Sequence, residues 1–583
     1  MFGWLTCVCF RVCATKSKGF ETFSMDAVLW SHVVSAVPPR CRECLTLATP
    51  QSREAVLSRA PVSEQDVIGR LWWWKQRSSR YSSSDENDGI ALECRERSSS
   101  APPFTSAQFL DIAHAVVICQ ASHLRVESAT ISVVAATAAP TTSPTVRDFL
   151  QNLGRLHGLR NFKWVGFGLS ATIGVSWITN LANTLVTLDL TAAYGLAAVA
   201  HQFCSGSKGF HWSRLTTFIV EQTDVTDKAL AQVLGVMPYL EVLRLGGCSK
   251  LSSLQESLKS LSTAPDLVTD KTQAPDEEPT SRLRILSIPN TPIGPSGLIG
   301  LSTHAPRLTT LFCRNCISLT DAAAINGLQL LENLTLSTTG LFPSPLALEL
   351  LQQQQYSSSL SHLDNVPSLS TLDLSENIHL SEISSLARIG MHATLTSLNL
   401  SGTKITTEGL ERALLSFVRL KELRVSRCKS LTSLSAAIVL SPHLHRTLRV
   451  LDAAQSSLTS EGAASIKQLI RLTSLDLSGC THVVDSATLC GIVSSCSHLI
   501  SLSLYGCDSV TDDVVKVICS SLPRLESLNL GRCVSITSFE CGLVAPPPHN
   551  NAAGAAAVFD ASLRVLNLSG LRVSAASSRV TPC

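Results

Sequence analysis

Aromatic side chains are scarce in this sequence, making up 5% of its 583 residues. Charged residues are also few, at 16%, whereas hydrophobic residues reach 45%. A low charge content argues against a disordered or solvating chain. With so few aromatic residues, any core must be aliphatic. Because the chain is longer than one compact core usually supports, we expect several domains or a repeat array.

The sequence has almost no excess of charge of either sign. Its 47 basic and 45 acidic residues leave a formal net charge of +2. Nucleic-acid binding requires a concentrated basic face, so we expect no nucleic-acid partner. Uncharged apolar runs of the roughly 18 residues that span a membrane are also missing. The best candidate, residues 113–140, is interrupted by His123, Arg125 and Glu127, so we predict no membrane span.

Sequence motifs of catalysis are missing as well. We find no GxSxG, P-loop, HExxH or dinucleotide-binding glycine motif. The 15 histidines are scattered, and none lies at ligand spacing from other metal-binding residue types. Cys41 and Cys44 form a CxxC pair, but no second pair follows at zinc-finger spacing. We therefore predict a non-enzyme with no catalytic residues, no cofactor and no bound metal.

What the sequence does contain is an internal repeat, L-x-x-L-x-L-x-x-(C/N/T), whose nine positions we number from its first Leu. Clear copies read LTSLDLSGC from Leu472, LISLSLYGC from Leu499 and LESLNLGRC from Leu525. These starts are 27 and 26 residues apart, in the upper half of the leucine-rich-repeat range. We identify fifteen copies, which begin at Leu159, Leu185, Leu215, Leu240, Leu283, Leu308, Leu331, Leu369, Leu395, Leu420, Leu448, Leu472, Leu499, Leu525 and Leu563.

Each copy predicts a strand, a turn and a helix. Positions four and six alternate as in a strand and should both point into the core. The segment that follows, such as Ser509 to Pro523, has a Thr-Asp helix start, apolar residues at helical spacing and a Pro stop. Segments from Asp224 and Ser318 repeat this pattern. The sequence thus predicts an α/β leucine-rich-repeat solenoid (horseshoe) with a parallel inner sheet and outer helices, preceded by a poorly defined N-terminal region.

Many of the 20 cysteines recur at position nine, where the chain turns away from the strand. We predict that these are reduced, buried thiols that act as small hydrophobes in a reducing compartment. The corresponding localisation is cytoplasmic, with a nuclear location and organelle targeting by residues 1–24 left open. The cysteines at this position are Cys248, Cys316, Cys428, Cys480, Cys507 and Cys533.

The units that read C-x-x-(I/L/V)-T-D-x-x-(L/V) after the strand, such as the one from Cys507, resemble the cysteine-containing leucine-rich-repeat family. The resemblance covers about residues 145–583. That family includes substrate receptors of Skp1–cullin–F-box ubiquitin ligases and relatives without an F-box, so Skp1 and a cullin are implied as alternative partners. Between residues 25 and 145 we do not identify an F-box, which would open with an apolar Leu-Pro signature.

Composition shifts divide the rest of the chain. Three intervals exceed the repeat length, and we predict that they contain loop insertions. The predicted organisation is a targeting segment or misplaced start over 1–24, a small helical unit over 25–76, a Ser-rich linker over 77–103, a helical N-terminal cap over 104–158, and repeats over 159–583 with insertions near 249–282, 337–368 and 534–562.

The candidate binding residues lie on the inner sheet, where positions three, five and seven project away from the core. Most of these residues are small or hydroxylic, while a few are large. Arg, Tyr and Phe suit interface anchors because they combine a large contact area with directional bonding. The candidate anchors, including two at position eight, are Arg244, Phe312, Arg314, Arg424, Arg427, Tyr505 and Arg532. Residues of opposite charge at position five are Asp189, Asp373, Asp452 and Asp476.

From these observations we predict a non-enzymatic protein–protein interaction scaffold that binds a protein partner on the concave face of the solenoid. One alternative is the substrate-receptor subunit of a Skp1–cullin–F-box type ubiquitin ligase. A second alternative is an enzyme with an unrecognised N-terminal active site. For any single inner-face residue, the competing interpretation is a solvated sheet with balanced charge.

Overall fold

The computed structural model describes most of the repeat region and three strands near or before its start. The described residues are 90–95, 129–134, 159–165, 169, 176–204, 211–263, 281–342, 363, 366–383, 386, 393–441, 443–480, 484–537 and 563–571. The predicted segments 1–24 and 25–76, with Cys41 and Cys44, therefore lie outside the described residues, as do large parts of the three predicted insertions.

Two compact units make up the chain. The N-terminal unit comprises Met1–Leu251 and Glu256–Leu283, and the C-terminal unit comprises Ser252–Gln255 and Arg284–Cys583. The boundary falls within the interval for which the sequence predicts an insertion near 249–282. We describe each unit by itself.

In the N-terminal unit, parallel strands pair in the order in which they occur in the chain. The strands are β1 (Ile90–Arg95), β2 (Ala129–Val134), β3 (Leu159–Val165), β4 (Thr187–Asp189), β5 (Thr217–Ile219) and β6 (Val242–Arg244). The helices are α8 (Ser176–Thr179), α9 (Leu196–Val199), the 3₁₀ helix η1 (Ala200–Cys204), α10 (Asp227–Leu234) and most of α11 (Gln255–Ser262).

The C-terminal unit continues the same pattern, with parallel neighbours in chain order. Its strands are β7 (Ile285–Ser287), β8 (Thr310–Phe312), β9 (Asn333–Thr335), β10 (Thr371–Asp373), β11 (Ser397–Asn399), β12 (Glu422–Arg424), β13 (Val450–Asp452), β14 (Ser474–Asp476), β15 (Ser501–Ser503), β16 (Ser527–Asn529) and β17 (Val565–Asn567). Its helices are η2 (Pro295–Leu298), α12 (Leu301–His304), η3 (Ala323–Ile325), α14 (Thr407–Leu414), α15 (Ser435–Leu440), α16 (Leu444–Thr447), α17 (Ser460–Ala464), η7 (Ser465–Gln468), α18 (Ser486–Ser495) and α19 (Asp512–Ser521).

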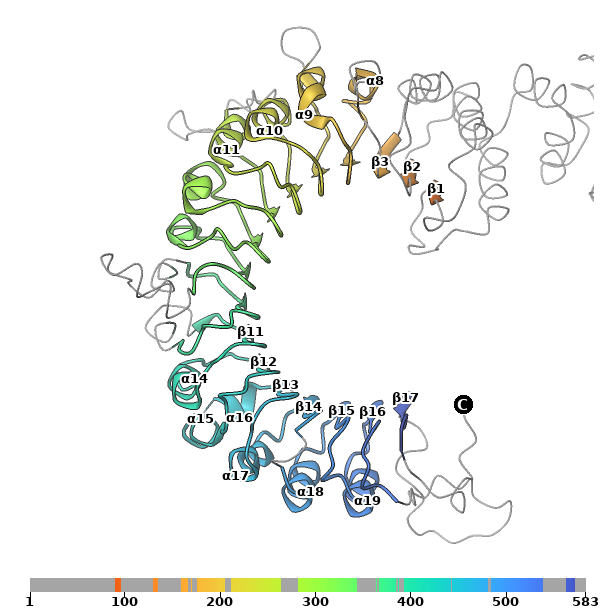
Figure 1. The fold of residues 1–583 in the computed structure, drawn as a ribbon, viewed down its shortest axis with the longest axis vertical. Helices are drawn as coiled ribbons and strands as arrows, with labels where there is room; N and C mark the ends of the chain where they lie inside the picture. The colour runs from red at the N-terminus through yellow and green to blue at the C-terminus, as the bar shows by residue number, and fades with distance from the viewer. Residues whose placement is uncertain are drawn as a thin grey trace, which may run out of the picture. The chain divides into compact units, whose positions relative to one another are not determined.

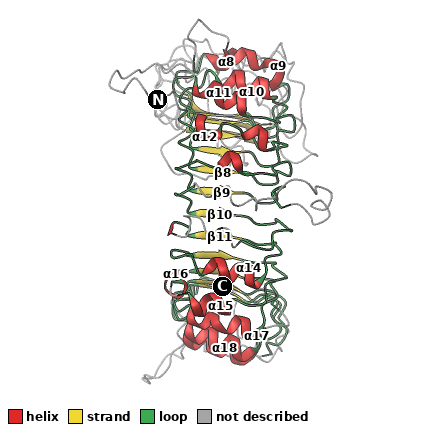
Figure 2. Ribbon diagram, turned by 90° about the vertical axis from the view of Figure 1, so that its left-hand side faces the viewer, coloured by secondary structure: helices red, strands yellow, loops and turns green. Residues whose placement is uncertain are grey.

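Within the C-terminal unit, strands and helices occupy opposite sides of each repeat. Figure 1 shows β11 to β17 along one side of the ribbon and α14 to α19 along the other. Turned by 90°, β8, β9, β10 and β11 lie one above the next as parallel rungs (Figure 2). Each strand from β3 to β17 falls in one of the fifteen repeats found in the sequence, so the predicted leucine-rich-repeat solenoid is confirmed.

The leucines at positions one, four and six form the regular part of the core, to which apolar residues of the helices add. In the repeat of β15, Leu502 is 1% exposed and Leu504 is fully buried. The sheet register places Leu502 between Leu475 and Leu528 of the neighbouring strands. Each repeat therefore buries its leucines by stacking on its neighbours rather than on itself, as the sequence pattern requires.

Position nine carries a hydroxyl or a thiol in most repeats, and in four places a hydroxyl repeat directly precedes a thiol repeat. Thr403 donates to Leu400 O of its own turn over 2.7 Å, whereas Cys428 reaches back to the same carbonyl from the next repeat over 3.2 Å. The pairs Thr223 with Cys248, Thr291 with Cys316, and Ser456 with Cys480 repeat this arrangement.

The burial predicted for the position-nine cysteines is confirmed. All six are free thiols and buried, with relative exposures of 0–2%. Cys519, on the outer helix α19, is disulfide-bonded. Cys519 does not occupy position nine and is not one of the six buried thiols there.

Every repeat from Leu185 to Leu563 has a left-handed backbone at position eight. The angle φ is positive there whether the residue is glycine or not, for example 73° at Gly402 and 59° at Arg427. A positive φ costs non-glycine residues free energy, so the packed turn must enforce it. The residues at this position are Ala192, Gln222, Gly247, Asn290, Asn315, Thr338, Glu376, Gly402, Arg427, Gln455, Gly479, Gly506, Arg532 and Gly570.

The helices after the turns largely follow the predicted pattern. Helix α10 begins after Thr226, whose hydroxyl accepts the Ala229 N–H, and α19 occupies the predicted Ser509–Pro523 segment. The segment from Ser318 differs, because the structure contains only the short 3₁₀ helix η3 there. The repeat from Leu308 to Leu331 is shorter than the others, so it leaves no room for several helical turns.

Two strands lie before the first repeat predicted at Leu159. Strand β1 falls in the stretch predicted to be a Ser-rich linker, and β2 in the stretch predicted to be a helical cap. They pair in parallel with each other, and β2 pairs with β3. The sheet therefore extends further toward the N-terminus than the repeat motif indicates, because strand pairing does not require the full leucine pattern.

Candidate protein-binding surface

The candidate site is the inner face of the C-terminal unit, which we define as the side chains at positions three, five and seven of the repeats from β7 to β17. In β10, Thr371 and Asp373 are partly exposed, while Leu372 between them is buried. Register brings equivalent positions together, since Asp373 lies beside Asn399, and Asn399 beside Arg424. A column of position-five side chains thus crosses neighbouring strands.

Asp and Asn at position five end the strand that carries them. Asp373 Oδ1 accepts the Ser375 N–H over 2.9 Å, and Asp476 Oδ1 accepts the Ser478 N–H over 2.8 Å. The sequence suggested only a charge role for these aspartates, and the structure adds a structural one. The same bond is made by Asp189, Asn399, Asp452, Asn529 and Asn567.

Asp452 and Asp476 lie side by side in the register of β13 and β14. Burial raises the pKa of the Asp452 carboxyl, and repulsion from Asp476 raises it further. The hydrogen bond from the Ala454 N–H and the positive charge of Arg424 act in the opposite direction on this pKa. This pair is therefore the most acidic point of the position-five column, bordered by an arginine.

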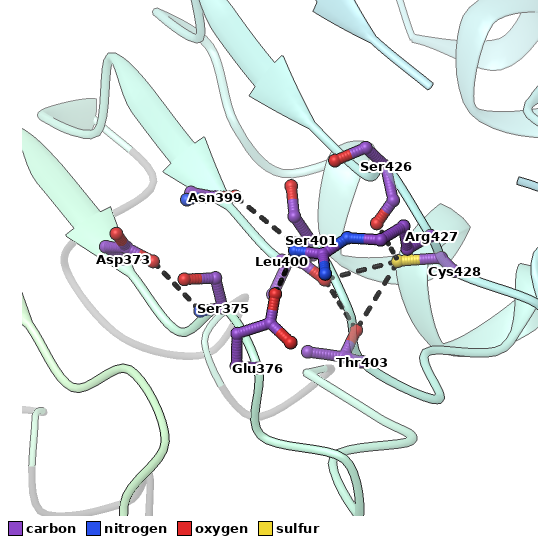
Figure 3. A network of polar contacts seen from close by, with 10 residues as sticks. All are labelled: Asp373, Ser375, Glu376, Asn399, Leu400, Ser401, Thr403, Ser426, Arg427 and Cys428. Atoms are coloured by element: carbon purple, nitrogen blue, oxygen red, sulfur yellow. Dashed lines mark hydrogen bonds and ion pairs between the residues drawn. The ribbon is translucent and has the colours of Figure 1, made fainter. Parts of the chain in front are cut away.

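A charged pair spans three repeats at the rim of this face (Figure 3). The Arg427 guanidinium donates to the Glu376 carboxylate, and both residues occupy position eight. Gly402 holds position eight of the intervening repeat, and a Cβ atom there would lie 2.7 Å from the Glu376 carboxylate. The intervening glycine thus leaves open the space through which the two side chains meet.

Arg424 points from β12 on the inner face and has a partner within its own strand. Its guanidinium lies 3.5 Å from the Glu422 carboxylate, with both side chains substantially exposed. Exposed pairs of this kind contribute only ~0–1 kcal/mol. A carboxylate from another protein could therefore compete for Arg424 at little cost.

Tyr505 and Arg532 come together at the C-terminal end of the inner face. The Arg532 guanidinium carbon lies 5.8 Å from the centre of the Tyr505 ring, at the outer limit of a cation–π contact. Gly531 lies beneath the same ring, since a Cβ there would be 2.9 Å from Tyr505 Cδ2. The ring therefore lies close to both a glycine and a guanidinium.

Phe312 and Arg314 stand together in the repeat of β8. The Phe312 side chain is 40% exposed, and the register places it between Ser287 and Thr335, which are much smaller. Arg314 is exposed and forms no ion pair with any residue that the structure describes. These two side chains therefore project beyond the smaller side chains of the neighbouring strands.

The structure places all seven predicted anchors at exposed or partly exposed positions. It brings Tyr505 and Arg532 into contact, whereas Arg424 and Arg427 pair with different glutamates. Arg244 is exposed on β6, which belongs to the N-terminal unit, whereas the other six belong to the C-terminal unit. Their role in binding a partner stays a prediction.

Sequence reasoning missed Glu376 and the special backbone of position eight. A signal was present, because glycine recurs at this position in Gly247, Gly402 and Gly479. It also missed that Cys313 and Cys316 form a CxxC pair in the repeat of β8. Because Cys316 also belongs to the position-nine series, its pairing with Cys313 at position six is easy to overlook in the sequence.

Among the described residues, no three His, Cys, Asp or Glu side chains are grouped so that they could hold a metal ion. In the same part of the chain, none of the helices combines the length and apolar character needed to cross a membrane.

Comparisons with known proteins give one family match and several similar structures. Residues 392–412, which include β11, match the model of the Leucine Rich repeat family. An internalin of Listeria monocytogenes is similar at 18% identity and a TM-score of 0.41, over 63% of this chain and 86% of that one. A leucine-rich-repeat protein of Leptospira interrogans matches at 17% identity and a TM-score of 0.42, over 73% and 93%. A chain of the yeast Rad7 and Elc1 complex matches at 19% identity and a TM-score of 0.36, over 54% and 74%.

Proposed function

We propose that this leucine-rich-repeat chain is a non-enzymatic scaffold that holds a partner protein against the inner face of its C-terminal unit. Solenoids of this type commonly serve protein–protein interaction. The observation that carries the proposal is the contrast on this face between a few large side chains and a floor of Ser, Thr and Asn. Phe312, Arg314, Arg424 and Tyr505 project from that floor.

The arrangement of these side chains supports anchoring rather than simple solvation. Tyr505 lies over Gly531 and next to Arg532, so an aromatic and a guanidinium group stand together on this surface. Arg314 forms no ion pair among the described residues, and Arg424 has the exposed pair with Glu422 and lies beside Asp452. Large aromatic and guanidinium groups are the residue types that most often dominate binding free energy.

The proposal is tested first by identifying the partner and then by matched charge reversals. Affinity purification of the full chain with mass spectrometry supplies the partner. Arg424→Glu should then weaken the complex by at least ~2 kcal/mol, roughly 30-fold in Kd, because it reverses the charge of an anchor. Isothermal titration calorimetry measures the change, and circular dichroism checks that folding is intact.

Lys516→Glu is the matched control. Lys516 is exposed on α19, on the helix side of its repeat, where it pairs only with the exposed Asp513. The same change of charge there should leave affinity nearly unchanged. If Lys516→Glu disrupts the complex while Arg424→Glu does not, the partner docks on the helices or on the insertions, and the inner-face proposal is wrong.

The partner experiment also decides between this proposal and its alternatives. Recovery of Skp1 and a cullin would favour a substrate receptor of a ubiquitin ligase, as the cysteine-containing repeats suggest. Their absence beside a reproducible partner would favour a scaffold outside such ligases. We also propose a reducing compartment such as the cytoplasm. The recurrence of buried free thiols at position nine supports this proposal, whereas the disulfide-bonded Cys519 opposes it.

A further inference from the structure

One repeat carries a second thiol beside its position-nine cysteine. In the repeat of β8, the turn reads Cys313-Arg314-Asn315-Cys316, with cysteines at positions six and nine. Other repeats with cysteine at position nine have an aliphatic residue at position six, such as Leu477 before Cys480. Both Cys313 and Cys316 are fully buried free thiols.

The turn brings positions six and nine close together. In the equivalent turns, the N–H of position nine donates to the carbonyl of position six, as from Cys480 to Leu477 over 3.2 Å. Four-residue turns of this kind hold their end Cα atoms within about 7 Å. Disulfides span Cα distances of about 4.4–6.8 Å. The backbone of this repeat is therefore compatible with a bond between the two sulfurs.

The two thiols also differ in acidity. Interaction with the neighbouring Cys313 thiol lowers the pKa of Cys316 to about 7 despite its burial. The same interaction and burial raise the pKa of Cys313 well above its ordinary value. By contrast, burial raises the pKa of Cys507, at position nine of another repeat, to about 12. Because the thiolate is the nucleophile, Cys316 should react first.

Little protein covers this turn. Arg314 and Asn315 are exposed between the two cysteines, and Ile317 directly after them is 71% exposed. Cys316 itself is fully buried and the turn is hydrogen-bonded to both neighbouring repeats, so a small oxidant reaches its sulfur only when this turn opens.

We propose that Cys313 and Cys316 form a vicinal dithiol that a small peroxide converts to a disulfide within one repeat. The Cys316 thiolate attacks one oxygen of hydrogen peroxide and breaks the O–O bond, which gives a sulfenic acid and, after protonation, one water. Cys313 attacks that sulfur, forms the S–S bond and releases the second water. Two electrons pass from the thiols to the peroxide. The S–H that donates from Cys316 to Ile288 O over 3.1 Å is lost.

The test exposes the reduced, native full chain to a small excess of hydrogen peroxide, stopped with catalase. Remaining thiols are alkylated in denaturant with N-ethylmaleimide. Trypsin cleaves after Arg314, between the two cysteines, and a Glu-specific protease cleaves after Glu332. The disulfide then joins the peptides 308–314 and 315–332, and mass spectrometry should detect this linked pair. Cys480 and Cys507 should be recovered alkylated.

Two substitutions copied from other repeats serve as controls that retain the fold. Cys316→Thr places at position nine the residue that Thr403 provides elsewhere, and Cys313→Val places at position six the residue found at Val425. Either variant should lose the linked pair. The proposal is overturned if both cysteines of the wild type are alkylated after peroxide treatment, or if Cys316 is oxidised to a sulfinic acid without linkage to Cys313.

Discussion

At the scale of single residues, the side-chain atom at position nine, oxygen or sulfur, decides whether it donates to a carbonyl of its own turn or to one of the preceding repeat. A hydroxyl is short and bonds within its own turn, as Ser456 does to Ala453 O over 2.6 Å. A thiol has longer bonds and reaches the carbonyl of the preceding repeat, as Cys533 does to Leu504 O over 3.1 Å. Because these groups are buried, each bond gives the hydroxyl or thiol a partner and avoids the cost of an unpaired buried donor.

We predict that the position-nine cysteines resist labelling in the native protein. Burial raises the pKa of the Cys507 thiol to about 12, so both access and thiolate are scarce near neutral pH. Titration with a thiol reagent should leave Cys248, Cys428, Cys480, Cys507 and Cys533 largely unmodified until denaturant is added. Rapid native modification of most of them would contradict the packing described here.

Leu502→Ala should lower stability much more than Arg424→Ala. Leu502 is 1% exposed, and its truncation leaves a cavity that costs ~2–5 kcal/mol. Arg424 is exposed and paired only with Glu422, so its truncation should cost under ~1 kcal/mol. Thermal unfolding followed by circular dichroism measures both. Equal shifts in Tm would contradict the strand register.

Asp485 should contribute a pH-dependent part of stability. It precedes α18, and its carboxylate accepts the Thr488 N–H over 2.6 Å, which lowers the pKa of Asp485. A depressed folded-state pKa stabilises the fold above the unfolded value of about 3.9, and this contribution is lost as the pH falls through the folded value.

Asp485→Asn isolates this effect, because Asn can cap the helix without the charge. The difference in Tm between wild type and variant should be largest near neutral pH and shrink below about pH 4. A difference that is constant from pH 7 to pH 3 would show that the charge does not contribute.

At the scale of elements, neighbouring repeats approach so closely that some helix positions admit no side chain. Gly462 lies in α17, and a Cβ there would be 2.2 Å from Thr432 O of the preceding repeat. Gly491 in α18 has nothing within 4 Å of its Cβ position. Position 462 therefore has no room for the methyl group of alanine, whereas position 491 has.

We predict that Gly462→Ala destabilises the protein by ~1–3 kcal/mol, because the added methyl group must push the adjacent backbone away. Gly491→Ala should instead stabilise it by roughly 0.5–1 kcal/mol, the usual gain of helix propensity. Chemical denaturation of both variants provides the comparison. A stabilised Gly462→Ala variant would mean that α17 packs less closely than the structure shows.

The strands and turns were predictable because the leucines repeat with a fixed period and a fixed alternation. Each strand from β3 to β17 was located by its own motif. Helices were less predictable, since the segment from Ser318 has the same Thr-Asp start but forms only η3. The start signal is local, whereas helix length depends on the room that the next repeat leaves.

The candidate site was predictable only in part. Alternation indicated that Arg424 and Tyr505 would face outward, and the structure agrees. It could not indicate that Arg427 pairs with Glu376 across Gly402, because these residues are adjacent only after three repeats have stacked. Contacts that depend on a common left-handed turn are not visible in the leucine pattern.

For the whole molecule, the repeat predicts a long stack but not where the chain divides into compact units. The division into two compact units falls in the long interval between Leu240 and Leu283. Its composition predicted an insertion there, but a boundary between units depends on contacts that composition does not encode.

Where a hydroxyl repeat precedes a thiol repeat, position nine also determines between which repeats the chain can be divided without breaking a side-chain hydrogen bond. A hydroxyl repeat is self-contained at its turn, whereas a thiol repeat depends on an acceptor that the preceding repeat supplies. A fragment that begins with the repeat of Thr403 would keep the hydrogen bond from Thr403 to Leu400 O. A fragment that begins with the repeat of Cys428 would lack Leu400 O, the acceptor of the Cys428 thiol. The natural module of recombination in such stretches is thus a pair of repeats, hydroxyl first and thiol second.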